Sequence, residues 1–446
     1  MRAANAARPA RRPASGPGTR LAIAGGTPAV PPGAHRPWPD IAAADRAALR
    51  RVLDRGELWG PNAPEVGRLQ EEWAGYVGAR FCLVVNSGTA ALHCALVGAG
   101  VGPGDEVIVP AFGFVATPMA VLHAGAVPVF CDIDPVTHTI DPRLAEERIG
   151  VRTRAILPVH AHGLPAEMDR LRAIARRRGL ALIEDAAQAH GASYGGVMAG
   201  ALCDLAGFSL NGSKGLPAGE GGLLTTDDEE AFVAARRLAI FGEDTPPLGP
   251  GQYRAYWSHG LGWNYRGHEL TAALARSQLR RLDRHNLTAQ RNAALLNAGL
   301  ADLPGLEPPH VPDDRTCVFY RYRIRIEPAE LGFSGPPLEL RDRLLWALQA
   351  EGVAASLWQL LPLPAQPVFR RGGRDPWDRA EHPESDRLLE SSIVLGTATE
   401  MLHNQASELI ERYLEAFEKV LSDRKTLFTA RYRPVRPWPP IPPERS

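Results

Sequence analysis

The stretch from Phe81 to Ala91, FCLVVNSGTAA, decides the fold. Its first five residues are apolar and rich in valine, which predicts a short buried strand. The next six, Asn86-Ser87-Gly88-Thr89-Ala90-Ala91, contain a glycine turn that meets the start of an apolar helix. A strand that leads directly into a helix is the repeating unit of parallel sheets covered by helices.

Strands and helices keep alternating after this stretch. Predicted strands cover residues 106–110, 127–133, 155–159, 180–183, 207–210 and 222–225, and the helices among them include 119–122, 166–178 and 229–240. This alternation predicts an α/β fold with a mainly parallel sheet sandwiched by helices. Residues 243–260, rich in Pro, Gly and Tyr, are expected to form a surface excursion, and one helix is expected from about Glu269 to Ala298.

The chain is expected to divide into a large and a small domain. Residues 60–285 would form the large domain, and residues 300–425 a smaller α+β C-terminal domain. Residues 21–59 would be an N-terminal segment that joins the small domain. We expect residues 1–20 to be a disordered extension and residues 426–446 a Pro-rich tail without a core of its own.

The overall charge is balanced, since 50 Lys and Arg face 50 Asp and Glu over 446 residues. Proteins that bind nucleic acids or anionic membranes use a basic surface excess, so we expect neither partner. The long uncharged stretch 81–104 is broken by Gly, Pro, Asn and Ser and therefore predicts buried core rather than a membrane span. The five cysteines lie far apart without a C-x-x-C pair, which is typical of reduced thiols in a cytoplasmic protein and predicts no metal site.

Lysine is rare in this chain. Three of the 50 basic residues are lysines, at Lys214, Lys419 and Lys425. Lys214 follows a predicted buried strand, in the small-residue loop Asn211-Gly212-Ser213-Lys214. A lysine has the flexible stem and deprotonable amine that imine formation needs, and arginine does not. Because arginine is used almost everywhere else, we favour a chemical role for Lys214 over a solvated surface position.

Two further features could bind parts of one ligand. Asp185 stands at the end of a predicted strand, where open α/β sheets bind ligands; its carboxylate suits a protonated pyridine nitrogen, although it could equally cap a helix. Ser87-Gly88-Thr89 lies at a strand-to-helix junction whose free amides suit a phosphate, although such a motif is often only an N-cap. Ser209, five residues before Lys214, could add a second hydroxyl.

These pieces converge on one cofactor. Lys214 would react with an aldehyde, Asp185 would pair with a pyridine nitrogen, and the turn at Ser87-Gly88-Thr89 would bind a phosphate. A ligand that carries all three groups is pyridoxal 5′-phosphate (PLP). The order and wording of the motifs resemble the DegT/DnrJ/EryC1/StrS aminotransferase family of fold-type I PLP-dependent enzymes over about residues 21–425. The stretches that carry this resemblance are 86–92, 104–110, 184–191, 209–222 and 262–266.

The resemblance implies a role for each matching residue. Lys214 would bond to the aldehyde carbon of the cofactor and then move a proton, while Asp185 would keep the pyridine nitrogen protonated. Cofactor contacts are also implied for Gly88, Thr89, Ala90, Phe114, Gln188, Ser209 and Asn264. Phe114 would stack on the cofactor ring, with an ordinary core position as the alternative. Asn264 would reach the phosphate of a neighbouring subunit, in a homodimer with shared active sites.

The substrate regions match the family less well. The opening Leu21–Pro28 is most similar to the branch that aminates keto-cyclitols or makes aminohydroxybenzoate. Where relatives show a Tyr-x-Pro-Leu-His type of stretch, this chain has Leu357–Pro364, which indicates an unusual acceptor. Trp59 and Arg266 are the candidate substrate residues, and a structural role is equally open for each.

The function implied by the resemblance is transfer of an amino group from L-glutamate or L-glutamine to a keto-sugar or keto-cyclitol. A PLP-dependent dehydratase, lyase or aldol-type enzyme on the same site is the first alternative. Lys214 argues against the sugar dehydratases of this fold, which carry histidine at that position. A PLP-binding regulator without activity is the second alternative, and it is disfavoured because both Lys214 and Asp185 are present.

Overall fold

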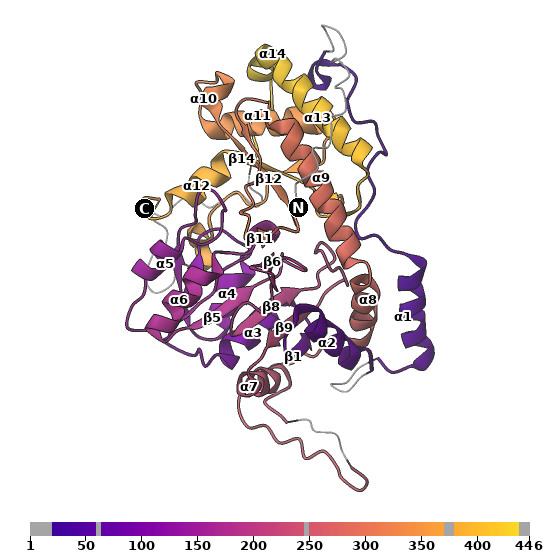
Figure 1. The fold of residues 1–446 in the computed structure, drawn as a ribbon, viewed down its shortest axis with the longest axis vertical. Coiled ribbons are helices and arrows are strands. Elements are labelled where there is room, and N and C mark those ends of the chain that lie inside the picture. Colours follow the sequence, from indigo (N-terminus) through magenta and orange to yellow (C-terminus); the bar gives the residue numbers. More distant parts are fainter. Residues whose placement is uncertain (1–19, 59–63, 245–248, 370–378, 437–446) are drawn as a thin grey trace, which may run out of the picture.

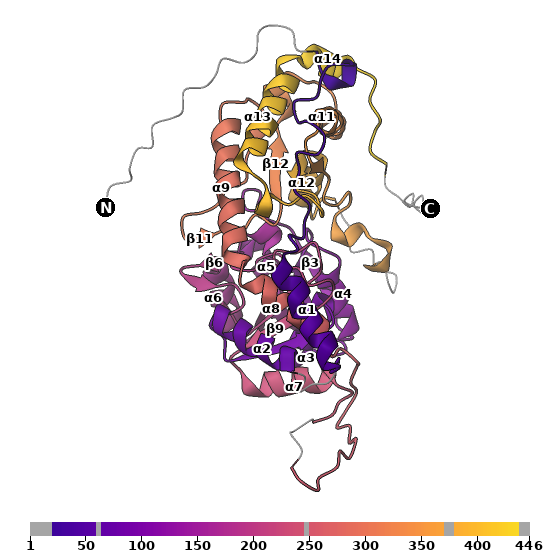
Figure 2. The ribbon, with the colours of Figure 1, turned by 90° about the vertical axis from the view of Figure 1, so that its right-hand side faces the viewer.

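A computed structural model of the protein describes residues 20–58, 64–244, 249–369 and 379–436 (Figure 1). Residues 1–19 of the predicted extension and residues 437–446 of the predicted tail lie outside the described residues. In both views the large domain occupies the lower part of the molecule and the small domain the upper part (Figures 1 and 2).

The large domain is built on a seven-stranded sheet with the order β1-β9-β8-β5-β4-β2-β3. Its strands are β1 (Phe81–Val85), β2 (Glu106–Pro110), β3 (Val127–Cys131), β4 (Thr153–Ile156), β5 (Ala181–Asp185), β8 (Leu205–Ser209) and β9 (Gly222–Thr226). β9 pairs antiparallel with β1 and β8, and the other neighbouring pairs are parallel. The predicted mainly parallel sheet is therefore confirmed.

Helices cover both faces of this sheet. One face carries α2 (Pro64–Val77), α6 (Met168–Arg178) and α8 (Glu269–Leu279), and the other carries α3 (Gly88–Gly98), α4 (Ala116–His123) and α7 (Glu229–Ala239). Successive residues of β2 show the division. Ile108 lies in the same buried cluster as Leu171 of α6, whereas Val107 and Val109 lie with Leu92 of α3. Alternate side chains thus point to opposite faces of the sheet. The parallel pairing brings the carboxyl ends of these strands to one edge of the two-sided core.

The small domain has a four-stranded antiparallel sheet with the order β10-β12-β14-β13. Its elements are β10 (Leu306–Glu307), β12 (Tyr322–Ile326), α10 (Pro328–Leu331), α11 (Pro337–Ala350), β13 (Ala355–Ser356), α12 (Pro383–Glu390), β14 (Ser392–Leu395), α13 (Ser407–Ser422) and α14 (Arg424–Thr429). Leu21 and Val30 of the N-terminal segment lie in the core of this domain. The following helix α1 (Ala43–Arg55) instead packs on α8 of the large domain, so the N-terminal segment contacts both domains.

The expected single helix from Glu269 to Ala298 was wrong in one respect. The structure has two helices, α8 and α9 (Leu282–Leu300), with a break at Arg280 and Arg281. The Arg281 guanidinium donates to the Asp45 carboxylate at 2.7 Å and to the Asp40 carbonyl at 2.9 Å. Because these partners come from the distant N-terminal segment, the helical periodicity of residues 269–298 could not show the break.

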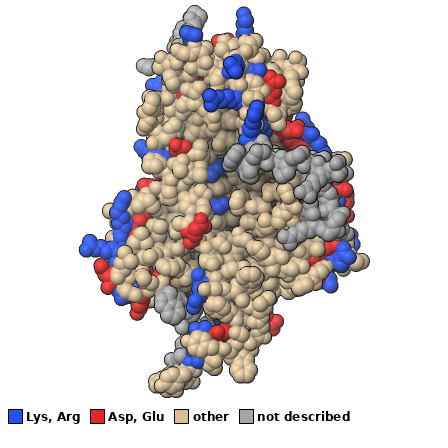
Figure 3. All heavy atoms as spheres, turned by 180° about the vertical axis from the view of Figure 1, so that it is seen from behind, with Lys and Arg blue, Asp and Glu red and all other residues tan. Residues whose placement is uncertain are grey.

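The described residues of the surface excursion predicted at 243–260 form an arm that projects from the large domain below α7, as expected (Figures 1 and 2). Tyr253, Tyr256, Trp257 and Leu261 expose between 71% and 91% of their surfaces there. No helix among the described ranges combines the length and apolar character needed to cross a membrane. On the face shown in Figure 3, basic and acidic side chains are interspersed.

Candidate active site

A cavity of about 340 Å³ opens where the carboxyl ends of β5 and β8 and the start of α3 meet the small domain. This volume lies in the usual range for small-molecule sites. It is lined by Ser87, Gly88, Thr89, Leu92, Phe114, Ala116, Asp185, Ala187, Gln188, Ser209, Asn211, Ser213, Lys214, Glu220, Tyr320 and Trp358. The sequence motifs of three separate stretches thus meet in one place.

Lys214 reaches the cavity from the loop after β8. Its amide donates to the Asn211 carbonyl at 2.9 Å, and its own carbonyl accepts from the Trp38 indole at 3.1 Å. Asn211 Oδ1 also accepts from the Ser213 hydroxyl at 2.8 Å. The Nζ atom lies 4.6 Å from the centre of the Tyr320 ring. Asn211 of the loop and Trp38 of the N-terminal segment therefore hold the lysine backbone from two sides, and the lysine side chain lines the cavity.

Asp185, at the end of β5, has 4% of its surface exposed. The Thr117 hydroxyl donates to its Oδ2 at 2.5 Å, and the Ala187 amide donates to Oδ1 at 3.1 Å. Burial raises the pKa of Asp185, against the lowering effects of these two hydrogen bonds and of the Lys214 charge. Within the described residues this carboxyl forms no ion pair. A buried carboxylate without a cation fits a protonated pyridine nitrogen in the cavity.

An anion site is formed where α3 begins. Ser87 caps the helix, and its Oγ accepts from the Ala90 amide at 3.1 Å. Gly88 and Thr89 are in the first turn, where backbone N–H groups have no intrahelical acceptor and the helix dipole favours negative charge. A Cβ at Gly88 would lie 2.8 Å from Ser209 Cβ, so glycine is required for this close approach of α3 to β8. The amides and hydroxyls together suit a phosphate.

Phe114 and Gln188 also line the cavity. Phe114 exposes 52% of its surface, which excludes the alternative interpretation of an ordinary core position. Gln188 is buried, and its Oε1 accepts from the His162 amide at 2.8 Å, which fixes the orientation of its side-chain amide. An aromatic face, a positioned amide, an anion site and a buried carboxyl are the features that a PLP molecule needs, and the cavity therefore fits this cofactor.

Three predicted residues that the structure describes are not among those that line the cavity. Ala90 is buried, and its amide bonds to Ser87. Asn264 is exposed, and its carbonyl accepts from the Asn86 side chain at 3.3 Å. Arg266 donates from Nε to Asn264 Oδ1 at 3.1 Å and lies over the Phe241 ring. Trp59 lies outside the described residues.

Sequence reasoning missed four residues that shape the site: Trp38, Thr117, Tyr320 and Trp358. Thr117 follows Phe114 closely, and a polar residue in that apolar helix start was a usable signal. Tyr320 and Trp358 come from the small domain, and Trp38 comes from the N-terminal segment. Their approach depends on how the two domains pack, for which no local pattern exists.

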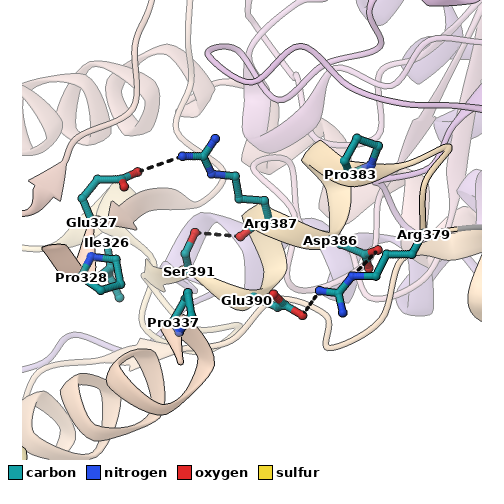
Figure 4. A pocket seen from close by; sticks show the side chains of 10 residues that line it. All are labelled: Ile326, Glu327, Pro328, Pro337, Arg379, Pro383, Asp386, Arg387, Glu390 and Ser391. Carbon is teal, nitrogen blue, oxygen red and sulfur yellow. Dashed lines mark hydrogen bonds and ion pairs between the residues drawn. The ribbon is translucent and has the colours of Figure 1, made fainter. Parts of the chain in front are cut away.

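A second hollow, of about 240 Å³, lies beside β12 and α12 in the small domain (Figure 4). Its charged side chains pair with one another, as Arg379 does with Glu390 and Arg387 with Glu327. None of the predicted site residues with a described position lies there, so the cavity around Lys214 is the candidate active site.

Comparisons with known proteins agree with this geometry. The model of the DegT/DnrJ/EryC1/StrS aminotransferase family matches residues 39–413. The L-glutamine:2-deoxy-scyllo-inosose aminotransferase of Streptomyces paromomycinus is 41% identical over 324 residues, 70% of this chain and 75% of that protein. A pleiotropic regulatory protein of Geobacillus stearothermophilus is 36% identical over 357 residues, 79% of this chain and 89% of that protein.

A solved structure has the same fold. The crystal structure of 3-amino-5-hydroxybenzoic acid synthase superposes with a TM-score of 0.79 at 30% identity, covering 87% of this chain and 98% of that one. The relatives thus include an inosose aminotransferase and an aminohydroxybenzoate synthase, the two branches that the stretch Leu21–Pro28 resembles. This chain belongs to the DegT/DnrJ/EryC1/StrS aminotransferase family and has the fold-type I architecture of a PLP-dependent aminotransferase.

Proposed function

We propose that this aminotransferase binds PLP at Lys214 and moves the amino group of L-glutamine or L-glutamate to the ketone of a cyclitol or sugar. The observation that carries this proposal is the meeting of Lys214, Asp185 and the start of α3 in one cavity. Solved relatives in PLP and pyridoxamine forms support the same cofactor.

Each group of the chain has a distinct task in this proposal. Bound PLP would supply an electron sink for the substrate's α-carbon. In the first half of the reaction the Nζ atom of Lys214 would take a proton from the donor's α-carbon and pass it to the cofactor's aldehyde carbon. In the second half it would move a proton from that cofactor carbon to the carbonyl carbon of the acceptor. Asp185, held by Thr117 and Ala187, stabilises positive charge at the end of β5. The first-turn amides of α3 and the Ser209 hydroxyl bind the anionic end of the ligand.

The proposed substrate class rests on the relatives and on the wall of the cavity. An inosose aminotransferase that uses L-glutamine is among the closely related proteins, which favours a cyclitol ketone as acceptor. The indole ring of Trp358 forms part of the cavity wall. It makes edge-to-face contacts with Phe112 and His162, whose ring centres lie 5.3 Å and 4.8 Å from its own. Such a surface suits the C–H face of a six-membered ring.

The proposed assembly is a homodimer with shared active sites. Asn264 is exposed at the base of an arm that carries exposed aromatic side chains, and a second copy would cover these apolar surfaces. A mixture of Lys214→Ala and Asn264→Ala proteins tests the sharing. Subunit exchange should restore activity above that of either variant alone, and no gain on mixing would contradict shared sites.

We also propose a cytoplasmic location, because the five cysteines are free thiols.

The test of the proposed reaction uses the purified protein loaded with PLP. L-Glutamine or L-glutamate should remove the yellow colour of the lysine-bound cofactor, and a keto-cyclitol should restore it. A Lys214→Ala protein should show neither change. Loss of water from a sugar, or a coloured species that persists with an amino acid, would instead favour the dehydratase or aldol-type alternative. A protein that keeps its colour with every donor would favour a regulator.

A further inference from the structure

Tyr320 lies against the reactive lysine from the opposite domain. It precedes β12 in the small domain, lines the same cavity and has 6% of its surface exposed. Its ring packs in a small cluster with Trp38 and Met401, and Trp38 also donates to the Lys214 carbonyl. The Tyr320 ring is therefore packed beside the Lys214 amine, whose Nζ lies 4.6 Å from the ring centre, and the phenol is within hydrogen-bonding reach of that amine.

A second cation contacts the same ring. The Arg321 guanidinium lies 4.2 Å from the Tyr320 ring centre, and its Nη2 is 3.5 Å from the phenol oxygen. Arg321 is itself buried, with 6% exposed, and forms no ion pair with a carboxylate in the described ranges of the chain. A buried cation without a counterion favours negative charge on the nearest group that can carry it, and the Tyr320 oxygen is such a group.

The other groups around Tyr320 do not compete for this role. Burial and then the charges of neighbouring cations lower the pKa of His162 and His403, so these imidazoles are neutral. Ser213 approaches from the lysine loop, but its hydroxyl proton is donated to Asn211 Oδ1, and Trp38 and Met401 carry no charge. Burial alone would raise the pKa of Tyr320, but the charges of Lys214 and Arg321, together with hydrogen bonding to the phenol, outweigh it and lower that pKa.

We infer that Tyr320 is a second proton-handling catalytic residue, which exchanges a proton with Lys214. In this step the O–H bond of the phenol breaks and an N–H bond forms on the Lys214 amine, giving phenolate and ammonium, and the reverse step restores both neutral groups. The proton count is unchanged over the exchange. Arg321 is a positioning residue that stabilises the phenolate. This inference rests on the proposed role of the Lys214 amine.

The first test needs no cofactor and no substrate. Cofactor-free protein is acetylated with acetic anhydride between about pH 6 and about pH 10, a range that spans amine ionisation. With three lysines in the chain, peptide mass spectrometry resolves Lys214, and exposed Lys425 serves as an internal reference. In Tyr320→Phe the phenolate is lost, so the labelling midpoint of Lys214 should move to lower pH and labelling near pH 8 should rise at least about threefold.

Tyr322→Phe is the matched control. Its hydroxyl is also buried, but it donates to Asn297 at 2.6 Å and lies outside the cavity. This control should keep the labelling midpoint of the parent. An unchanged midpoint in Tyr320→Phe would overturn the inference. A measurement on the parent itself avoids dependence on how the variant folds: near-ultraviolet titration should show one tyrosine ionising below the ordinary value of about 10, and its absence would also overturn the inference.

The second test uses the PLP-loaded protein. The rate of colour loss with L-glutamine should fall at least about tenfold in Tyr320→Phe, as expected for loss of acid–base assistance, with little change in KM. A rate within about twofold of the parent would overturn the inference. If the parent itself shows no colour loss with any donor, the proposed reaction fails, and the labelling experiment still decides the role of Tyr320.

Discussion

Thr117 offers the sharpest test of how the site holds Asp185. It is fully buried in α4, and its hydroxyl donates to Asp185 Oδ2 at 2.5 Å. Thr117→Val keeps the branched shape and removes this donor. A hydrogen bond to a charged group contributes about 1.5–3 kcal/mol, and each 1.4 kcal/mol corresponds to about tenfold in an equilibrium constant. Because the proposed PLP site depends on the charged form of Asp185, we expect PLP affinity to fall by roughly tenfold to a hundredfold.

The assay is fluorescence or absorbance titration of cofactor-free protein with PLP. Thr225→Val is the matched control, since Thr225 is equally buried and its hydroxyl donates to the neutral Gly200 carbonyl at 2.7 Å, away from the cavity. The control should lower the free energy of unfolding by about 0.5–1.5 kcal/mol and leave PLP affinity unchanged. Equal PLP affinities for Thr117→Val and the parent would refute the reasoning.

Two further predictions concern the pyridine end and the aromatic face of the site. Burial raises the pKa of Asp185 in the cofactor-free protein, and a carboxyl whose folded pKa exceeds its unfolded pKa lowers stability progressively as pH rises from the unfolded value, about 3.9, through the folded value. Cofactor-free Asp185→Asn should therefore gain Tm relative to the parent as pH rises above about 4, while its PLP affinity drops; a Tm difference that does not grow as pH rises from about 4 would contradict the assignment. Phe114→Ala should weaken PLP binding by about twofold to tenfold through loss of ring stacking worth about 0.5–1.5 kcal/mol. Because Phe114 is 52% exposed, its unfolding free energy should stay within about 0.5 kcal/mol of the parent, and a larger loss would show a core role instead.

The residues that sequence reasoning identified are those whose signals are local. Lys214 is a rare lysine in an arginine-rich chain, and Asp185 ends an apolar strand. Ser87-Gly88-Thr89 marks a strand-to-helix turn, and the structure places it at one end of the same cavity. These features follow from the strand and helix pattern, because parallel strands bring their carboxyl ends to one edge.

The residues that it missed depend on contacts between distant segments. Trp38 reaches the lysine loop from the N-terminal segment, and Tyr320 reaches it from the small domain. The break before α9 has the same origin, since Arg281 is held by Asp45. The Ala90 amide shows a further limit. A phosphate motif does not reveal which of its amides the N-cap side chain already occupies.

The central claim is that Lys214 forms the bond to PLP. Borohydride reduction of the PLP-loaded protein makes such a bond permanent, and peptide mass spectrometry then locates the pyridoxyl group among the three lysines. We predict a single modified peptide that contains Lys214. Modification at Lys419 or Lys425 alone, or no stable modification, would contradict the account.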